Sequence, residues 1–221
     1  MKAVLFDVDD TLMDFKKCSY YALKKALLIR GHRMDDHFYE SFMILNQILW
    51  KEFAKGNIER DILLNQRWKF LFEQTRIDVD HQGFDLIFQD CLKDEYFLID
   101  GAIDLLEYLY PKYDLYIVSN GVLIGQKYRL KKSGIDKYFK DFFISEAIGY
   151  SKLRIEFFDY CLDKIKCNKE DVIIIGDSID ADIKGGKNAG IKTCYVNLKR
   201  NINHVVCDYE VHSLKEIKAF L

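Results

Sequence analysis

The sequence predicts a doubly wound α/β fold, built on a Rossmann-like parallel sheet, with an all-helical segment inserted after the first strand. Two observations carry this prediction. Short apolar runs alternate with helix-like segments in the second half of the chain, which is typical of parallel strands covered by helices on both faces. Residues 16–98, in contrast, show only helical periodicity, as at Phe42, Leu45, Leu49 and Phe53.

The individual elements follow from these patterns. Residues 3–6 form an apolar run of strand length, and later runs of the same kind predict further strands at residues 113–120, 140–145, 171–177, 191–197 and, more weakly, 209–214. Helices are predicted between them at residues 126–134, 154–165 and 182–190, and within the insertion at residues 16–31, 37–56, 57–75 and 84–97. The predicted domains are therefore an α/β core, residues 1–15 with 99–221, and a helical cap, residues 16–98. We call residues 16–98 the helical insertion.

Composition narrows the function classes. The chain has 221 residues, of which 49% are apolar and 31% charged, as in ordinary globular proteins. A net charge of −2 gives no electrostatic reason to expect nucleic acid or an anionic membrane as a partner. No apolar run approaches the roughly 20 residues that a spanning helix needs, and the N-terminus lacks the apolar region of a signal peptide. Six scattered cysteines without a CxxC pair favour free thiols in the cytoplasm.

The stretch FDVDDTL at the end of the first strand indicates a candidate functional site. Asp7, Asp9 and Asp10 crowd together there, and such carboxylates repel one another unless a positive charge lies between them. The stretch is therefore either a solvated turn or a cation site. Because the carboxyl ends of parallel strands meet at one edge of a sheet, polar residues after the other strands belong to the same place. These residues are Thr11, Ser119, Asn120, Lys152, Asp177, Ser178 and Asp182.

This set of residues fits Mg²⁺ and a phosphate. Mg²⁺ takes few carboxylates, several waters and a substrate phosphate oxygen. An aspartate can attack phosphorus to form an aspartyl-phosphate, and a lysine with hydroxyl donors can hold the phosphate oxygens. We therefore expect a Mg²⁺-dependent reaction on a small, soluble phosphate monoester, and we favour the cation site over the solvated turn.

At these residues the sequence resembles the haloacid dehalogenase superfamily. Four motifs occur in that family's order, each after a predicted strand: DVDDT at residues 7–11, SN at 119–120, Lys152, and GDSIDAD at 176–182. The resemblance implies that Asp7 is the nucleophile and Asp9 the general acid and base. It also implies that Asp7, Asp177 and the Asp9 carbonyl hold Mg²⁺.

The resemblance implies further roles for the remaining motif residues. Ser119 and the Asn120 backbone N–H would bind phosphate oxygens together with Lys152, and Asp182 would hold Lys152 or a metal-bound water. Asp9 favours a phosphatase over a dehalogenase, because only an ester needs an acid to protonate the leaving oxygen.

A narrower resemblance covers most of the chain. The stretches NG…Q..RL..SGI..YF, ISE..G..K….FDY and GDS…DI.GG.NAGI.TCY.N are similar to the pyrimidine 5′-nucleotidase branch of the superfamily. Within the insertion, Asn46, Trp50 and Arg67 fall where that branch has similar residues, and they are the candidates for contacting a base. The expected substrate is thus a nucleoside 5′-monophosphate.

Three alternatives and one departure from the family pattern remain at this point. A sugar-phosphate phosphatase or a phosphomutase on the same fold would have the same core motifs, and a non-catalytic regulatory relative would have little use for two crowded acids. The family usually places proline after the motif lysine, whereas this chain has Leu153. Without proline, the loop that aims Lys152 is expected to be looser.

Overall fold

The computed structural model describes residues 1–202 and 205–221. Within these residues, six parallel strands form one sheet in the order β3-β2-β1-β4-β5-β6. The strands are β1 (Ala3–Phe6), β2 (Asp114–Ser119), β3 (Asp141–Ile144), β4 (Val172–Gly176), β5 (Lys192–Val196) and β6 (Tyr209–Val211). The chain winds outward from the central β1 in both directions, which confirms the predicted doubly wound fold.

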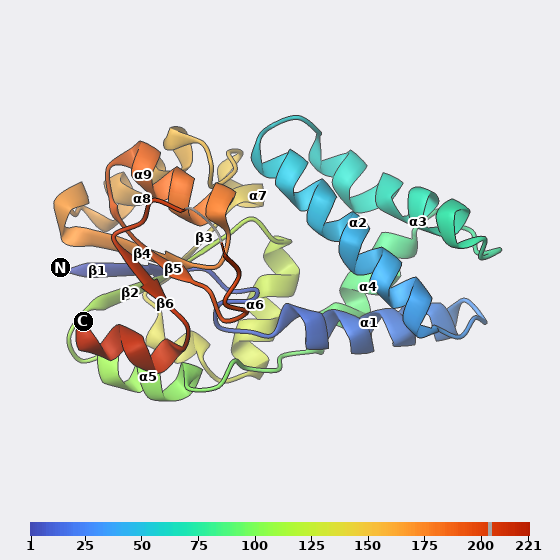
Figure 1. The fold of residues 1–221 in the computed structure, drawn as a ribbon, viewed down its shortest axis with the longest axis horizontal. Helices are drawn as coiled ribbons and strands as arrows, with labels where there is room; N and C mark the ends of the chain where they lie inside the picture. Colours follow the sequence, from blue (N-terminus) through green and yellow to red (C-terminus); the bar gives the residue numbers. More distant parts are fainter. Residues whose placement is uncertain (203–204) are drawn as a thin grey trace.

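Helices cover both faces of this sheet (Figure 1). Val4 and Phe6 of β1 face one layer, formed by α5 (Ala102–Leu109) and the 3-10 helix η5 (Leu214–Ala219). Ala3 and Leu5 face the other layer, formed by α8 (Ile155–Ile165) and α9 (Gly185–Ala189). Because successive side chains of a strand point to opposite faces, a strand buried on both faces is apolar throughout, as β1 is.

The helical insertion lies beside the sheet (Figure 1). Its helices are α1 (Phe15–Ile29), α2 (Asp36–Ala54), α3 (Arg67–Thr75) and α4 (Phe84–Leu92). They share an apolar cluster of their own, in which the ring of Phe42 stacks on that of Trp68 at a centroid distance of 5.6 Å. The Asp14 and Asp35 side chains cap the N-termini of α1 and α2 by accepting from backbone N–H groups.

The main differences from the sequence prediction concern three helical segments. The helix predicted over residues 57–75 begins later, because the Asn57 amide donates to Glu52 at the end of α2, and it contains a π-helix, η1 (Ile62–Gln66), that runs directly into α3. A second π-helix, η4 (Ile179–Lys184), precedes α9, so the helix predicted from residue 182 begins earlier. Helix α5 is absent from the prediction, although Leu105, Leu106 and Leu109 have helical spacing.

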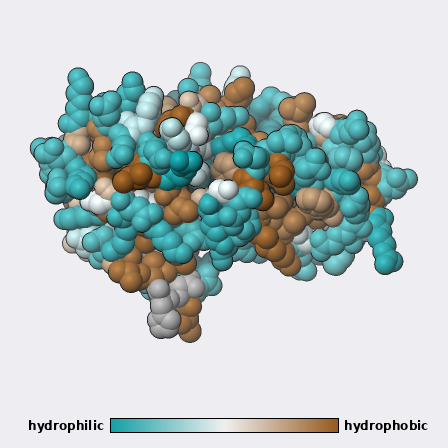
Figure 2. Space-filling model, turned by 90° about the horizontal axis from the view of Figure 1, so that it is seen from above, coloured by the Kyte–Doolittle hydropathy of each residue, from teal (hydrophilic) through white to brown (hydrophobic). Residues whose placement is uncertain are grey.

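Seen from above, the surface is largely hydrophilic, with apolar side chains in scattered groups (Figure 2). In residues 1–202 and 205–221, none of the helices combines the length and the apolar character needed to cross a membrane.

Candidate active site

The carboxyl ends of β1, β2 and β4 open into a cavity of about 860 Å³, which α2 lines from the opposite side. Most of the predicted site residues line it: Asp7, Asp9, Asn46, Trp50, Ser119, Asn120, Lys152, Asp177 and Ser178. The parallel register explains this convergence. Phe6 pairs with Ile117 on one side and with Ile175 on the other, so the residues that follow these strands meet at one edge.

Lys152 links two of the acids. It is 2% exposed, and its Nζ forms ion pairs with Asp7 and with Asp182, the latter at 2.6 Å. Asp182 also accepts from the backbone N–H of Ser178 at 3.0 Å. Asp182 therefore lies where it can position Lys152 beside Asp7, which is one of the two roles that the family resemblance implied for it.

Burial sets the ionisation of this cluster. It raises the pKa of Asp7 to about 7, although the charge of Lys152 opposes the rise. Burial, together with the nearby Asp7, also raises the pKa of Asp177 well above its usual value. For Lys152 burial acts in the opposite direction, but the carboxylates of Asp182 and Asp7 outweigh it and raise the pKa of the ammonium. One lysine thus faces three acids, and a further cation would relieve their repulsion.

The acids fit a divalent metal ion. Asp7, Asp177 and Asp182 each offer a carboxylate oxygen, and these atoms lie within 4.8 Å of one another. Carboxylate oxygens are hard ligands of the kind that Mg²⁺ prefers. Since Asp7 and Asp177 line the cavity whereas the fully buried Asp182 does not, Asp7 and Asp177 are the carboxylates best placed to hold the ion.

The loop after β1 fixes Asp7. The Asp7 N–H donates to the Ile175 carbonyl at 2.9 Å, and Thr11 Oγ1 donates to Asp7 Oδ2 at 3.3 Å. Thr11 is fully buried and does not line the cavity, so it holds Asp7 from the side of the protein core. Asp10 has a left-handed backbone with φ of 58°, and its side chain accepts from the Phe15 N–H, which ends the loop where α1 begins.

Asp9 has partners that the sequence analysis did not identify. Its Oδ1 accepts from Arg129 Nη1 and its Oδ2 from Gln126 Nε2, both at 2.6 Å. These two residues lie one turn apart on α6 (Leu123–Lys132). Their i, i+3 spacing on a predicted helix directly after the SN motif is the signal in the sequence that could have indicated them.

The remaining polar residues organise the loops around the cavity. Ser119 Oγ accepts from the Gly121 N–H at 3.0 Å and from Gln126 Nε2 at 3.2 Å, which leaves its own hydrogen free to donate. Asn120 Oδ1 accepts from the Lys152 N–H at 3.0 Å. Ser178 caps η4 by accepting from the Ala181 N–H. The hydroxyl of Ser178 is thus structural.

The contacts of Lys152 bear on the expected effect of Leu153. The backbone N–H of Lys152 is held by Asn120, and its ammonium is held by two carboxylates. The start of α9 packs so closely that a Cβ at Gly185 would overlap the Lys152 carbonyl oxygen. Contacts from three other segments thus hold Lys152 although no proline follows it, and the expected loosening of the loop stays a prediction.

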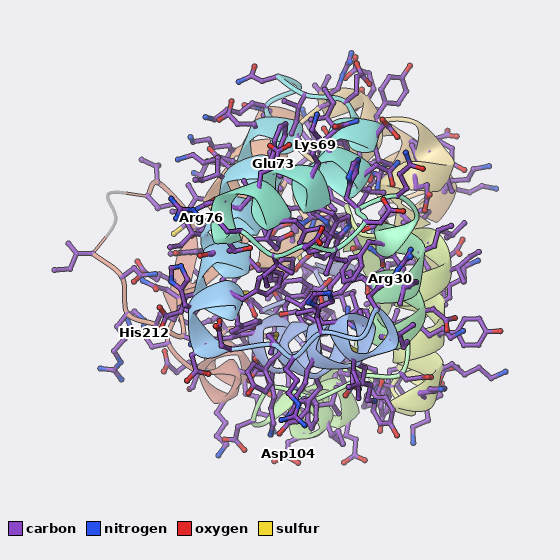
Figure 3. The ribbon with its side chains drawn as sticks, turned by 90° about the vertical axis from the view of Figure 1, so that its right-hand side faces the viewer. Arg30, Lys69, Glu73, Arg76, Asp104 and His212 are labelled. Carbon is purple, nitrogen blue, oxygen red and sulfur yellow. The ribbon has the colours of Figure 1, made fainter. Side chains whose placement is uncertain are left out.

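The three residues of the insertion that were predicted to contact a base differ in where they lie. Asn46 and Trp50 line the cavity one turn apart on α2, whereas Arg67 does not. Arg67 is 2% exposed and donates to Asp85 at 2.5 Å and to Asn46 Oδ1 at 2.9 Å. Direct contact of Arg67 with a base is thus contradicted, because its guanidinium is buried among aromatic rings in an ion pair. The exposed Lys69 and Glu73 of the same helix point outward instead (Figure 3).

Comparison with known proteins agrees with this geometry. The family model of haloacid dehalogenase-like hydrolases matches residues 1–190. The HAD-hydrolase YfnB of Bacillus subtilis is 36% identical, over 100% of this chain and 95% of its own. The pyrimidine 5′-nucleotidases PynA of Streptococcus pneumoniae and YjjG of Escherichia coli are 34% and 27% identical, over 98% and 99% of this chain and 93% and 96% of theirs.

A solved structure supports the same relationship. The crystal structure of YfnB bound to magnesium, which reveals interdomain movement, matches with a TM-score of 0.93 over 100% of this chain and 98% of that one. Family model, relatives and fold agree with the four motifs that meet at the cavity. The chain is therefore an enzyme that belongs to the haloacid dehalogenase-like hydrolases.

Proposed function

We propose that the protein is a cytoplasmic, Mg²⁺-dependent phosphomonoesterase that acts through a phospho-Asp7 intermediate. The observation that carries this proposal is the placement of Asp7 between Lys152 and Asp177, with Asp9 two residues on, in one cavity. The Asp7 carboxylate attacks phosphorus as the ester oxygen leaves. Bound by Asp7, Asp177 and the Asp9 carbonyl, Mg²⁺ would supply positive charge that offsets the repulsion between Asp7 and the phosphate.

Asp9, the proposed general acid, gives its proton to the leaving oxygen. The carboxylate that results then takes a proton from the water that attacks phospho-Asp7, so the second step returns the starting state. Lys152, the Ser119 hydroxyl and the Asn120 N–H would hold the phosphate oxygens throughout.

We further propose that the substrate is a nucleoside 5′-monophosphate with a pyrimidine base. Two pyrimidine 5′-nucleotidases are among the relatives. Asn46 and Trp50 lie in the same cavity as the acids, so one molecule can contact both groups. Since Arg67 can only donate, it fixes Asn46 Oδ1 toward itself. The amide nitrogen of Asn46 is then left to donate to a base carbonyl, and the Trp50 ring is available to stack on the base.

Kinetics on a substrate panel tests both statements. With Mg²⁺, kcat/KM is measured for pyrimidine and purine 5′-monophosphates, sugar phosphates and p-nitrophenyl phosphate. We expect the pyrimidine nucleotides to be preferred, and Asn46→Ala to lower kcat/KM for them roughly tenfold, the value of about one hydrogen bond, while sparing the aryl ester. Lys69→Ala, on the outer face of α3, is the matched control.

The panel also separates the alternatives. Preference for a sugar phosphate would replace the nucleotidase proposal with a sugar-phosphate phosphatase, and transfer of phosphate to a sugar hydroxyl would indicate a mutase. Equal losses on both substrate types in Asn46→Ala would show an effect on folding or closure and contradict the assignment of Asn46. Absence of any turnover with Mg²⁺ would remove the proposed reaction altogether.

A further inference from the structure

Two buried side chains of α6 hold the carboxylate of Asp9. Arg129 and Gln126 are 1% and 3% exposed, and each donates to a different oxygen of Asp9 at 2.6 Å. A carboxylate can accept about four hydrogen bonds, so each oxygen keeps a lone pair for a proton or a substrate. The carboxylate of Asp9 is thus held in place and can still accept a proton or contact a substrate.

These two donors are themselves fixed. Gln126 Nε2 also donates to Ser119 Oγ at 3.2 Å, and Gln126 Oε1 accepts from Arg129 Nη1 at 3.4 Å. Arg129 Nε donates to the backbone carbonyl of Glu95 at 3.0 Å, where the chain returns from the helical insertion. The Glu95 carboxylate in turn pairs with Lys25 of α1. Arg129 therefore joins the Asp9 loop, α6 and the base of the insertion.

We propose that Arg129 and Gln126 are positioning residues that aim Asp9 at the leaving oxygen of the substrate. The inference rests on the proposed phosphatase function. As the bond from Asp7 to phosphorus forms, the bond from phosphorus to the leaving oxygen breaks, and that oxygen takes the proton of Asp9. The carboxylate left on Asp9 stays paired with both donors, so its orientation is the same before and after the transfer.

A purely structural ion pair is the competing explanation. Burying an arginine removes its hydration, and the ion pair with Asp9 compensates for this only with good geometry. Loss of such a structural contact would weaken all substrates alike. Misorientation of Asp9 would instead lower activity unequally across substrates. A poor leaving group depends on proton donation, whereas a good leaving group departs without it.

The test is a series of ring-substituted phenyl phosphates, which share a shape and differ in the acidity of the phenol released. For each ester kcat/KM is measured with Mg²⁺, because this ratio covers the steps up to ester cleavage and excludes hydrolysis of phospho-Asp7. The variants are Arg129→Lys, whose point charge cannot reach Asp9 and Glu95 together, and Gln126→Met, which keeps the length but not the donor. Lys132→Met, on the exposed side of α6 where it pairs with Asp94, is the control.

We expect both variants to lose roughly a hundredfold on the least acidic phenol and under about threefold on the most acidic, within the range of general acid catalysis. The slope of log kcat/KM against phenol pKa steepens accordingly, and Lys132→Met keeps the wild-type slope. Equal losses across the series overturn the inference. If Arg129→Lys does not fold, Gln126→Met decides by the same slope. Failure of the wild-type enzyme on every ester overturns the proposed function and this inference with it.

Discussion

At the scale of single residues, Asp7 meets two opposing demands. Burial disfavours its charge and raises its pKa to about 7, whereas attack on phosphorus needs the carboxylate. Asp7→Asn removes the nucleophile with almost no change in shape. We expect kcat to fall more than about a hundredfold, which corresponds to roughly 3 kcal/mol of activation free energy. A phosphatase assay measures this, with circular dichroism as the control for folding, and retention of more than a hundredth of the activity would contradict the assignment.

The same substitution has an effect on stability in the absence of metal. Because the pKa of Asp7 in the fold lies above its ordinary value of 3.8, the folded state binds the proton more tightly than the unfolded chain does. The contribution of this carboxyl to stability is complete below about pH 4 and is lost as the pH rises to about 7. Asp7→Asn cannot ionise. In thermal melts with EDTA, the melting temperature of Asp7→Asn should therefore exceed that of the wild type by more at pH 8 than at pH 5. An equal difference at both pH values would contradict the raised pKa of Asp7.

Asp177 gives a separate test of the metal proposal. Its carboxylate lies with that of Asp7 within 4.8 Å, so a bound Mg²⁺ stabilises the folded state by mass action. We expect Mg²⁺ to raise the melting temperature of the wild type and to restore the activity that EDTA removes. In Asp177→Ala both effects should need at least tenfold more Mg²⁺. Ca²⁺ should support turnover poorly, because its coordination is looser. Full activity in EDTA would exclude the metal.

At the scale of elements, the strands could be predicted because each is a short apolar run that ends at polar residues. The sheet edge and the convergence of Asp7, Lys152 and Asp177 followed from that alone. The contacts of side chains within helices could not be predicted in the same way. Helical periodicity indicates which side of a helix is buried, but it does not indicate which residue of another segment lies against it. Arg67 was thus placed at the base site, although Asp85 holds it, and Arg129 was not recognised as a partner of Asp9.

The turn between α7 (Ser145–Ile148) and α8 allows a test of the Leu153 position. The Leu153 N–H donates no hydrogen bond to the described residues, so proline would remove none. Leu153→Pro should restrict the unfolded chain and stabilise the fold by up to about 1 kcal/mol. Activity should be retained, because Lys152 is held by other contacts. Thermal melting and the phosphatase assay measure both effects, and a loss of several degrees would show that the backbone here does not suit proline.

At the scale of the whole molecule, Arg60 connects the helical insertion to the core. It donates to the Asn120 carbonyl at 3.2 Å and to Ser145 Oγ at 2.7 Å, and its guanidinium lies over the Phe53 ring. The insertion is thereby tied to the loop that carries the SN motif. Such a tie is expected to restrict motion of the insertion relative to the core.

Arg60→Ala should loosen this connection. We expect a several-fold rise in KM and faster amide hydrogen exchange over residues 57–66, because the segment loses its contacts with the core. Arg76→Ala, at the outer end of the insertion (Figure 3), is the matched control. If exchange over residues 57–66 is the same in Arg60→Ala as in the control, Arg60 does not hold the two parts together.

The central position of β1 has a consequence for how the enzyme is made. Lys152, the ion-pair partner of Asp7, is synthesised 145 residues after it, and β4 with Asp177 emerges later still. Until then, β1 lacks a neighbour on one side and its aspartates have no lysine beside them. Because contacts so distant in sequence form late, the site stays incomplete until β4 has been made. The first turnover in a refolding experiment should therefore appear only after β4 has paired with β1.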